Sequence, residues 1–576
     1  MQEFEKAFNG HGFGRIAGIF VENAWVRDFL TISWDFRTIQ GRDNLIQYFA
    51  NNWQDTFVHT RLQEEGAFQP SFKNPTPELQ WVESMFVFET RYGRGKGMIR
   101  LVLDNEESQQ WKGYLINFTL QELKGQEEKT GLNRPHGYVD PAGGNWQQRR
   151  DREKEFVDED PVALVVGAGQ AGLSIAARLQ QLGVPTLIVE RSQCVGDSWR
   201  KRYKYCHMPY VPFPSNWPNF MPKDKLADWL ESYSNLMELN VWTQAGLQSS
   251  SFDNATKTWT VTLKRADGST CTLHPKHIVQ ATGNVGDPIV PQFPGQDEYK
   301  GTVYHGSQHS DASVHGDLGN KKVVVVGSGN SAHDICQNFH ACGAESVTML
   351  QRGGTYVLTA KKGLPMLHTG SYEEGGPPTD DCDIFSQSMP IPIQFAFNVH
   401  DTKTVSAVDK ETLDGLTKAG FKVDLGEDDS GIYRKYITRG GGYYIDVGCS
   451  QLIIDGKVKI RHSPGGIESF TPEGLLLADG SELQADIVVL ATGYQTMHST
   501  AQKLFGDKVA NCLGKVWDLN EEGEVHSIWR YSGHPNFWFM GGSLALCRSY
   551  SRLLALQIKA SEMGIYEAPG QRHSAA

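Results

Sequence analysis

The sequence predicts an α/β protein with two doubly wound parallel sheets, one inserted within the other, preceded by a separate α+β domain. From Pro161 onward, short apolar runs alternate with helical segments, which is typical of a parallel sheet. An apolar run followed by a glycine loop occurs twice, at Ala163–Gly172 and Val323–Ala332. An apolar strand ending in Ala-Thr-Gly also occurs twice, at His277–Gly283 and Asp486–Gly493. Two nucleotide-binding units, one inserted in the other, would produce this order.

The composition narrows the class of protein. A chain of 576 residues is too long for one ordinary core, so two or more domains are expected. Its net charge of -12 argues against a nucleic-acid partner. The nine cysteines include no CxxC pair, so neither a metal site nor a thioredoxin-type dithiol is expected. The polar start at Met1–His11 and the lack of a long apolar stretch predict a cytoplasmic protein with no membrane contact.

The N-terminal segment, residues 1–124, is expected to form the α+β domain. A helix is predicted around Ala24–Leu30, and alternation of apolar and polar residues predicts strands at Phe86–Arg91, Gly97–Leu103 and Tyr114–Leu123. Residues 125–160 are polar and are expected to form a linker.

The remaining chain divides into three segments. Residues 161–320 are expected to form the first part of one nucleotide-binding domain, and residues 441–576 its second part with a C-terminal helix. Residues 321–440 would form the inserted domain. Within it, Gly370–Asp383 is rich in Gly, Pro and Asp, which predicts a surface loop or lid.

The first glycine loop has the residues that a dinucleotide pyrophosphate requires. Gly167 permits the tight turn, Gly169 lets the backbone approach the phosphates, and Gly172 lets the following helix pack on the strand. Glu190, at the end of the next strand, is positioned to accept hydrogen bonds from ribose hydroxyls. The alternative is a structural glycine turn. The binding residues predicted here are Gly167, Gly169, Gln170, Ala171, Gly172, Glu190 and Arg191.

The second glycine loop differs at the end of its second strand, where Arg352 replaces the acid. A guanidinium pairs with a ribose phosphate that a carboxylate would repel. The first loop therefore suits FAD and the second NADPH rather than NADH. The alternative for Arg352 is a solvated surface arginine. The other predicted binding residues of this loop are Gly327, Ser328, Gly329, Asn330 and Ser331.

Four further motifs occur in order with these loops: Gly196-Asp197-Ser198-Trp199, Ala281-Thr282-Gly283, Ala491-Thr492-Gly493-Tyr494 and Gly541-Gly542. Together they resemble those of the class B flavin monooxygenases, which include the flavin-containing monooxygenases, the plant YUCCA-type enzymes and the type I Baeyer–Villiger monooxygenases. The resemblance covers about Pro161 to Ala560. It implies that the cofactors are also contacted by Gly196, Asp197, Ser198, Trp199, Thr282, Gly283, Thr492, Gly493, Tyr494 and Gly542.

The segment between the loops is similar to that family's fingerprint. Gly301 and His305 match it, whereas Tyr299 and His309 depart from it. The pattern is nearer to the flavin-containing monooxygenases than to the Baeyer–Villiger form. In the family this histidine helps to couple NADPH binding to catalysis, which makes His305 the candidate catalytic residue. The alternative is a structural histidine between domains.

The resemblance implies an enzyme that uses FAD, NADPH and O2 to insert one oxygen atom into a small organic substrate through a flavin hydroperoxide. Oxygenation of a nitrogen or sulfur atom is the leading expectation. Baeyer–Villiger-type or decarboxylating oxidation of a carbonyl compound is the alternative. A non-catalytic FAD-binding protein is the rival from another class, and a disulfide reductase is disfavoured because no CxxC is present.

The N-terminal segment resembles the SnoaL-like domains around Trp34–Arg42. That resemblance implies a cone of helices and a curved sheet. Its expected role is scaffolding or a contact in a homodimer. A second catalytic pocket is the alternative, and it would need a carboxylate or histidine facing the interior of the cone.

Overall fold

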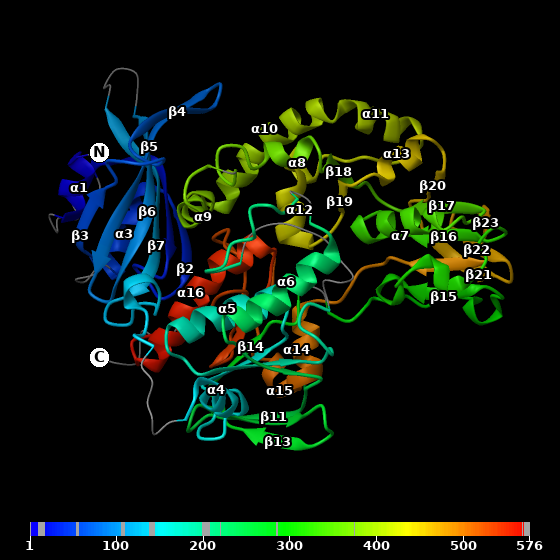
Figure 1. Cartoon of the computed structure of the whole chain (residues 1–576). Coiled ribbons are helices and arrows are strands. Elements are labelled where there is room, and N and C mark those ends of the chain that lie inside the picture. Colours follow the sequence, from blue (N-terminus) through cyan, green and yellow to red (C-terminus); the bar gives the residue numbers. More distant parts are fainter. Residues whose placement is uncertain are drawn as a thin grey trace. The chain divides into compact units, whose positions relative to one another are not determined.

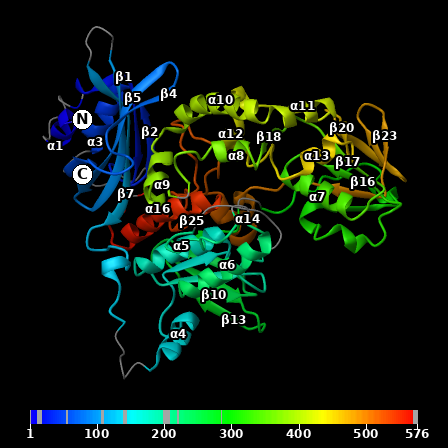
Figure 2. The ribbon, with the colours of Figure 1, turned by 45° about the horizontal axis from the view of Figure 1, so that its top comes forward.

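The computed structural model describes residues 2–9, 16, 18–52, 57–104, 110–137, 144–197, 208–218, 221–283, 286–373, 375–566 and 568. The chain forms two compact units (Figures 1 and 2). The first unit comprises Met1–Asn284, Pro377–Ile391 and Thr496–Ala576, and the second comprises Val285–Gly376 and Pro392–Gln495. Within the described ranges, no helix has both the length and the apolar character needed to cross a membrane.

The N-terminal part of the first unit is a mixed β-sheet with helices α1 (Gln2–Asn9) and α3 (Arg42–Asn52) on one face (Figure 1). Phenylalanine rings from both helices and from the sheet fill the space between them, including Phe8, Phe49 and Phe118. The strands, in their order across the sheet, are β2 (Phe36–Gln40), β1 (Phe20–Phe29), β7 (Trp111–Leu123), β6 (Gly93–Leu103), β5 (Leu79–Thr90) and β3 (Phe57–Leu62), with β4 (Ser71–Thr76) paired to β5.

Three strands predicted from alternation in this segment are confirmed as parts of β5, β6 and β7. The helix predicted around Ala24–Leu30 is wrong, because these residues belong to β1 and its end. All seven residues are buried, since one face of β1 packs on the domain core and the other on the rest of the first unit. A strand buried on both faces loses the alternation that identifies a strand in sequence.

The second part of the first unit contains one of the two predicted parallel sheets. Its first strand β8 (Ala163–Val166) is wholly buried, which explains its apolar run. Helix α16 (Leu544–Glu562) lies between β7 of the N-terminal sheet and helix α5 (Gln170–Gln181) in both views (Figures 1 and 2). The sheet order is β10 (Asn240–Thr243), β9 (Thr186–Glu190), β8, β14 (His277–Gln280) and β25 (Phe537–Phe539). The helices are α4 (Trp146–Glu155), α5 (Gln170–Gln181), α6 (Lys223–Leu236), α14 (Met497–Phe505), α15 (Asp507–Ala510) and α16 (Leu544–Glu562).

An antiparallel sheet accompanies each parallel sheet. In the first unit it consists of β11 (Gly246–Asp253), β12 (Thr258–Lys264) and β13 (Thr270–Leu273). In the second unit it consists of β21 (Ile467–Thr471), β22 (Gly474–Leu477) and β23 (Glu482–Gln484).

The second unit repeats the architecture with its own parallel sheet, so the prediction of two Rossmann-like folds is confirmed. The sheet order is β15 (Thr302–His305), β24 (Ile487–Leu490), β16 (Lys322–Val326), β17 (Ser346–Gln351) and β20 (Val458–His462). A two-stranded sheet is formed by β18 (Tyr356–Thr359) and β19 (Tyr443–Asp446). The helices are α7 (Asn330–Ala341), α8 (Gly363–Met366), α10 (Ile391–Val408), α11 (Lys410–Lys418), α12 (Gly431–Arg439) and α13 (Cys449–Ile454).

The segment predicted as a loop at Gly370–Asp383 is partly helical, so that prediction is wrong from Thr379 onward. Helix α9 (Thr379–Gln387) belongs to the first unit, although the chain on both sides belongs to the second. Its Asp383 forms a buried ion pair with Arg548 of α16 at 2.6 Å, and its Asp381 binds Lys96 of β6 at 2.5 Å. The aspartates that suggested an exposed loop are thus paired with cations.

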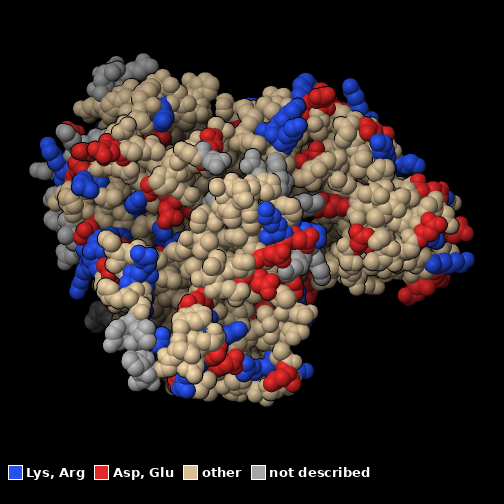
Figure 3. Space-filling view, in the orientation of Figure 1, with Lys and Arg blue, Asp and Glu red and all other residues tan. Residues whose placement is uncertain are grey.

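Acidic and basic side chains are interspersed over the described part of the face in Figure 3. On the described part of this face, no continuous basic surface of the kind typical of nucleic-acid binding is visible.

Candidate functional site

The first glycine loop connects β8 to α5 in a conformation that only glycine fits. Gly167 has a φ of 111°, and a Cβ atom added to it would lie 2.5 Å from the carbonyl oxygen of Ala281. A Cβ on Gly172 would lie 1.9 Å from the carbonyl oxygen of Gly167. Both glycines are therefore required by close packing of the loop against its own helix and against the end of β14.

Helix α5 begins without a side-chain cap, because its N-cap residue is Gly169. By contrast, α16 is capped by the Ser543 side chain, which accepts a hydrogen bond from the Leu546 amide. An uncapped helix start leaves amide donors and the positive end of the helix dipole for an anion. This geometry fits the pyrophosphate predicted from the sequence.

Glu190 lies at the end of β9 and binds the backbone of the first glycine loop. Its carboxylate accepts hydrogen bonds from the amides of Ala168 and Ser192, both at 2.8 Å. Arg191, which follows it, is exposed, whereas Ala171 is buried in α5.

The end of the chain meets the same loop. The Gln170 side-chain amide donates to the carbonyl oxygen of Gly542 at 3.1 Å. Gly542 has a φ of 117°, and a Cβ there would lie 2.9 Å from the Leu546 side chain. The structure thus brings together two predicted contacts that are separated by 372 positions in sequence.

The other residues predicted around the first loop are described in part. Gly196 has a φ of 88°, and its added Cβ would lie 2.5 Å from the Ala227 carbonyl oxygen. The Asp197 carboxylate accepts a hydrogen bond from the Cys194 amide at 3.0 Å. The Thr282 hydroxyl accepts one from the Gln280 side chain at 3.0 Å, and Gly283 has a φ of 93°. Ser198 and Trp199 lie outside the described residues.

The second glycine loop, between β16 and α7, repeats this packing. Gly327 has a φ of 126°, and its added Cβ would lie 2.5 Å from the carbonyl oxygen of Ala491. Helix α7 also starts at a glycine, Gly329, without a side-chain cap. In each unit the alanine of an Ala-Thr-Gly motif therefore supports the first glycine of the loop. Both motifs are evident in the sequence, whereas this role of Ala281 and Ala491 follows only from the fold.

Polar side chains of the second loop form hydrogen bonds to neighbouring segments of the chain. The Ser328 and Thr355 hydroxyls are 2.8 Å apart, and Asn330 accepts a hydrogen bond from the Ile445 amide of β19 at 2.9 Å. Ser331 is exposed in the first turn of α7.

Arg352 directly follows β17 and is exposed. Within the part of the chain that the structure describes, its guanidinium has no hydrogen bond or ion pair. Arg461, on the neighbouring strand β20, instead binds Asp479 at 2.7 Å. An exposed cation without a carboxylate partner can bind a phosphate, as the sequence predicts for Arg352.

His305 is buried at the end of β15, and both of its ring nitrogens are engaged. Nδ1 accepts a hydrogen bond from the Ser307 amide at 3.1 Å, which leaves Nε2–H to donate to the Gly493 carbonyl oxygen at 3.1 Å. Its ring also meets Tyr494 edge-on at 5.2 Å. Burial lowers the pKa of His305, so the neutral form is favoured. These contacts give it a role in holding Gly493 and Tyr494, and a catalytic role stays a prediction.

The second residue of the second Ala-Thr-Gly motif is also held by a hydrogen bond, since the Thr492 hydroxyl donates to the Ile289 carbonyl oxygen at 2.6 Å. His309, where the fingerprint departs from the family, bonds to the Tyr304 hydroxyl and to the Asn338 side chain, each at 2.9 Å. This departure is therefore accommodated by polar partners.

His333, in the first turn of α7, is a residue of this site that no sequence motif marks. Its ring stacks on Tyr444 of β19 with centroids 3.6 Å apart, and Nδ1 donates to the Gly329 carbonyl oxygen at 3.0 Å. Burial lowers its pKa to about 4. His333 and Tyr444 are more than a hundred positions apart in sequence, so only the fold shows that β19 packs against the second loop.

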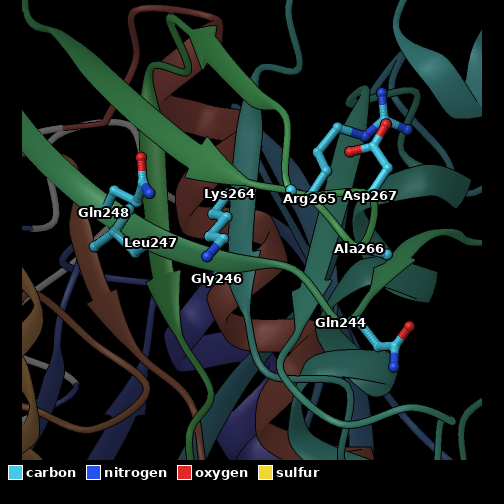
Figure 4. Close-up of a pocket in the computed structure, with 9 residues that line it drawn as sticks. Gln244, Gly246, Leu247, Gln248, Lys264, Arg265, Ala266 and Asp267 are labelled. Atoms are coloured by element: carbon cyan, nitrogen blue, oxygen red, sulfur yellow. The ribbon is translucent and has the colours of Figure 1, made fainter.

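An open depression of about 540 Å³ lies on the antiparallel sheet of the first unit (Figure 4). Lys264, Arg265 and Asp267 line it together with Gln244. None of the candidate cofactor residues lines it, so the depression is not assigned to the site.

Comparison with known proteins agrees with this geometry. The family described as pyridine nucleotide-disulphide oxidoreductase matches residues 162–363. Indole-3-pyruvate monooxygenase YUCCA1 of Oryza sativa is 28% identical over 361 residues, which cover 60% of this chain and 80% of that protein. Probable indole-3-pyruvate monooxygenase YUCCA4 of Arabidopsis thaliana is 28% identical and covers 58% of this chain and 76% of that protein.

Solved structures that align with part of this chain include a flavin-containing monooxygenase from Stenotrophomonas maltophilia. It is 16% identical with a TM-score of 0.45, over 70% of this chain and 99% of that one. Cyclohexanone monooxygenase is 15% identical with a TM-score of 0.47, over 70% of this chain and 87% of that one.

The paired sheets and glycine loops define the class as a two-dinucleotide-fold oxidoreductase. Within that class, the chain is similar to the YUCCA-type flavin monooxygenases over about 60% of its length, which confirms the resemblance predicted from its motifs. The resemblance of the N-terminal domain to SnoaL-like proteins stays a prediction.

Proposed function

We propose that this protein is an FAD- and NADPH-dependent monooxygenase acting on a small organic substrate. The observation that carries the proposal is the repeated loop geometry. A Cβ added to Gly167 or to Gly327 would lie 2.5 Å from an alanine carbonyl oxygen, and the helix that follows each loop starts without a side-chain cap. Two such sites suit two dinucleotides. The acid Glu190 beside the first and the unpaired cation Arg352 beside the second support FAD and NADPH respectively.

The protein's own contribution is to bind and orient the two cofactors. The amides at the start of α5 would hold the FAD pyrophosphate, and Glu190 its ribose. The amides at the start of α7 would hold the NADPH pyrophosphate, and Arg352 its ribose phosphate. Bound FAD supplies acceptance of a hydride and reaction with O2. His305 holds the backbone at Gly493 and, being neutral, donates from Nε2.

The overall reaction consumes one substrate, one O2, one NADPH and one proton, and yields the oxygenated product, NADP+ and water. Oxygenation of a nitrogen or sulfur atom is the first candidate, because the fingerprint is nearer to the flavin-containing monooxygenases. A 2-oxo acid is the second candidate, because the relatives are named for indole-3-pyruvate. In that reaction the substrate loses CO2 and the remaining carbonyl carbon becomes a carboxylic acid.

The test uses 18O2 with NADPH and a panel of amines, sulfides, ketones and 2-oxo acids. Mass spectrometry of the products should find one labelled oxygen atom in the product of one substrate class. Label in an N-oxide or sulfoxide supports the first candidate, and label in a shortened carboxylic acid supports the second. NADPH oxidation without label in any product would contradict a monooxygenase.

A further inference from the structure

The N-terminal domain contacts a segment near the end of the chain that we call the strap, residues 520–531. Glu524 of the strap forms a buried ion pair with Arg27 of β1 at 2.7 Å and accepts a hydrogen bond from Thr38 of β2 at 2.6 Å. Glu522 binds Arg37 at 2.6 Å. Two adjacent strands of the N-terminal sheet therefore hold the strap through charged groups, two of which are wholly buried.

An aromatic stack continues from the same sheet. Phe29 and Phe36 both meet Tyr550 of α16, with ring centroids 6.1 and 5.9 Å apart. Tyr550 in turn stacks on Trp529 of the strap at 4.0 Å with nearly parallel rings. All four rings are buried, so they form one continuous contact from the N-terminal sheet to the strap.

Trp529 is fixed against the turn that contains Gly542. Its indole N–H donates to the carbonyl oxygen of Gly541 at 2.8 Å. A Cβ added to Gly542 would lie 3.3 Å from the Trp529 ring, so the indole packs directly on this glycine. Trp529 also has a left-handed φ of 66°, a strained conformation that persists only when its surroundings hold it.

The Gly541–Gly542 turn contacts the first glycine loop through the Gln170 side chain. The interior of the N-terminal domain, by contrast, is filled by phenylalanine rings, among them Phe4, Phe86 and Phe88. The buried carboxylate of Asp28 accepts hydrogen bonds from the Tyr48 hydroxyl at 2.8 Å and from the Ser33 amide at 2.9 Å, so it is engaged within the fold. The packed interior and this engaged carboxylate favour a structural role for the domain over a second catalytic pocket.

We propose that the N-terminal domain is a clamp on the flavin site. Its sheet holds the strap and Tyr550, these hold Trp529, and Trp529 fixes the Gly541–Gly542 turn against the first glycine loop. Trp529 and Tyr550 are thus positioning residues for a cofactor that they do not touch. The inference rests on the proposed binding of FAD at that loop.

The test measures flavin release from the purified full-length protein on dilution, followed by the fluorescence of free flavin. Phe36→Leu shortens the stack on the side of the N-terminal sheet. Trp529→Phe keeps a ring and removes the hydrogen bond to Gly541. Each variant should release flavin about tenfold faster than the unchanged protein, the effect of losing a buried hydrogen bond or close packing at the site.

Two control variants separate this effect from general loss of stability. Phe86→Leu alters a buried ring in the core of the same N-terminal domain. Trp242→Phe removes a buried indole N–H that donates to the Lys154 carbonyl oxygen at 2.9 Å. Both controls should release flavin at nearly the unchanged rate, while unfolding followed by circular dichroism reports any shared loss of stability.

Flavin release at the unchanged rate from Trp529→Phe would overturn the clamp, as would equal acceleration in the controls. Should Phe36→Leu fail to fold, Trp529→Phe and Trp242→Phe decide the matter. If the unchanged protein binds no FAD, the proposed function fails, and the clamp fails with it. That result is distinct from a protein that binds FAD and releases it equally in every variant.

Discussion

At the scale of single residues, Gly167 is the position where a small change should have the largest effect. In Gly167→Ala, the new methyl group would lie 2.5 Å from the Ala281 carbonyl oxygen, and the φ of 111° disfavours any side chain. We expect the purified variant to contain little flavin, as measured by its visible flavin absorbance relative to protein. Gly246→Ala, with open space around its added Cβ, is the control. Full flavin content in Gly167→Ala would remove the first loop from the site.

Arg352 should discriminate between the two nicotinamide cofactors. Arg352→Ala removes a charge-assisted hydrogen bond to the ribose phosphate, worth about 1.5–3 kcal/mol. The KM for NADPH should therefore rise at least about tenfold, and the KM for NADH should change little. Arg461→Ala is the matched control, because that guanidinium is already bound to Asp479. Equal changes for both cofactors would contradict the assignment.

His333 should make the stability of the second unit depend on pH. Its pKa is about 4 in the folded protein and about 6.5 when unfolded, so only the unfolded chain gains a proton between these values. The free energy of unfolding should fall by up to about 3 kcal/mol as the pH drops from 7 to 4. Urea unfolding of His333→Phe, which keeps a ring against Tyr444, should show a weaker dependence on pH. Parallel slopes in the two proteins would contradict this account.

The pH dependence must be read as a difference between variant and unchanged protein. Burial raises the pKa of Asp28 in the first unit to about 6. A carboxyl with a raised pKa favours the folded state at low pH, and that contribution is lost as the pH rises from about 4 to 6. The two groups act in opposite directions, and only the His333 contribution disappears in His333→Phe.

At the scale of elements, the strap depends on ion pairs of very different burial. Glu524→Gln leaves the Arg27 guanidinium buried without its counter-charge, which should lower the free energy of unfolding by about 3–5 kcal/mol. Glu522→Gln breaks a pair that is about one-third exposed, so its effect should be within about 1 kcal/mol. Denaturant unfolding of both variants measures the difference. Equal losses would show that burial does not determine the strength of the strap's attachment.

The elements that sequence predicts well are those specified by neighbouring residues. The strand, glycine loop and helix at β8–α5 and at β16–α7 follow from short apolar runs and glycine spacing, and both are confirmed. β1 could not be predicted in this way, because burial of both faces hides its alternation. α9 was missed because the partners of its aspartates, such as Arg548, lie far along the chain.

The residues of the candidate site also fall into two groups, those that local sequence identifies and those that only the tertiary fold identifies. Residues within a loop, such as Gly167 and Gly327, are identified by local spacing. Their supports, the Ala281 and Ala491 carbonyls, and the stack of His333 on Tyr444 depend on contacts between distant segments. Those contacts follow from the tertiary fold and have no local sequence signal.

At the scale of the whole molecule, the chain combines two Rossmann-like folds with an N-terminal domain whose core is closely packed. The two nucleotide folds account for the proposed use of FAD and NADPH. The N-terminal sheet is bound to the flavin-binding part of the first unit through Arg27, Phe29 and Phe36. A homodimer stays a prediction.

The most direct test of the central claim is a stopped-flow absorbance measurement on the full-length protein. The flavin is reduced anaerobically with NADPH and then mixed with O2, first without substrate and then with each member of the substrate panel. We predict a transient absorbance band that differs from both oxidised and reduced flavin and decays faster with one substrate class. Failure of NADPH to reduce the flavin, or direct return to the oxidised spectrum with stoichiometric hydrogen peroxide under every condition, would contradict a monooxygenase.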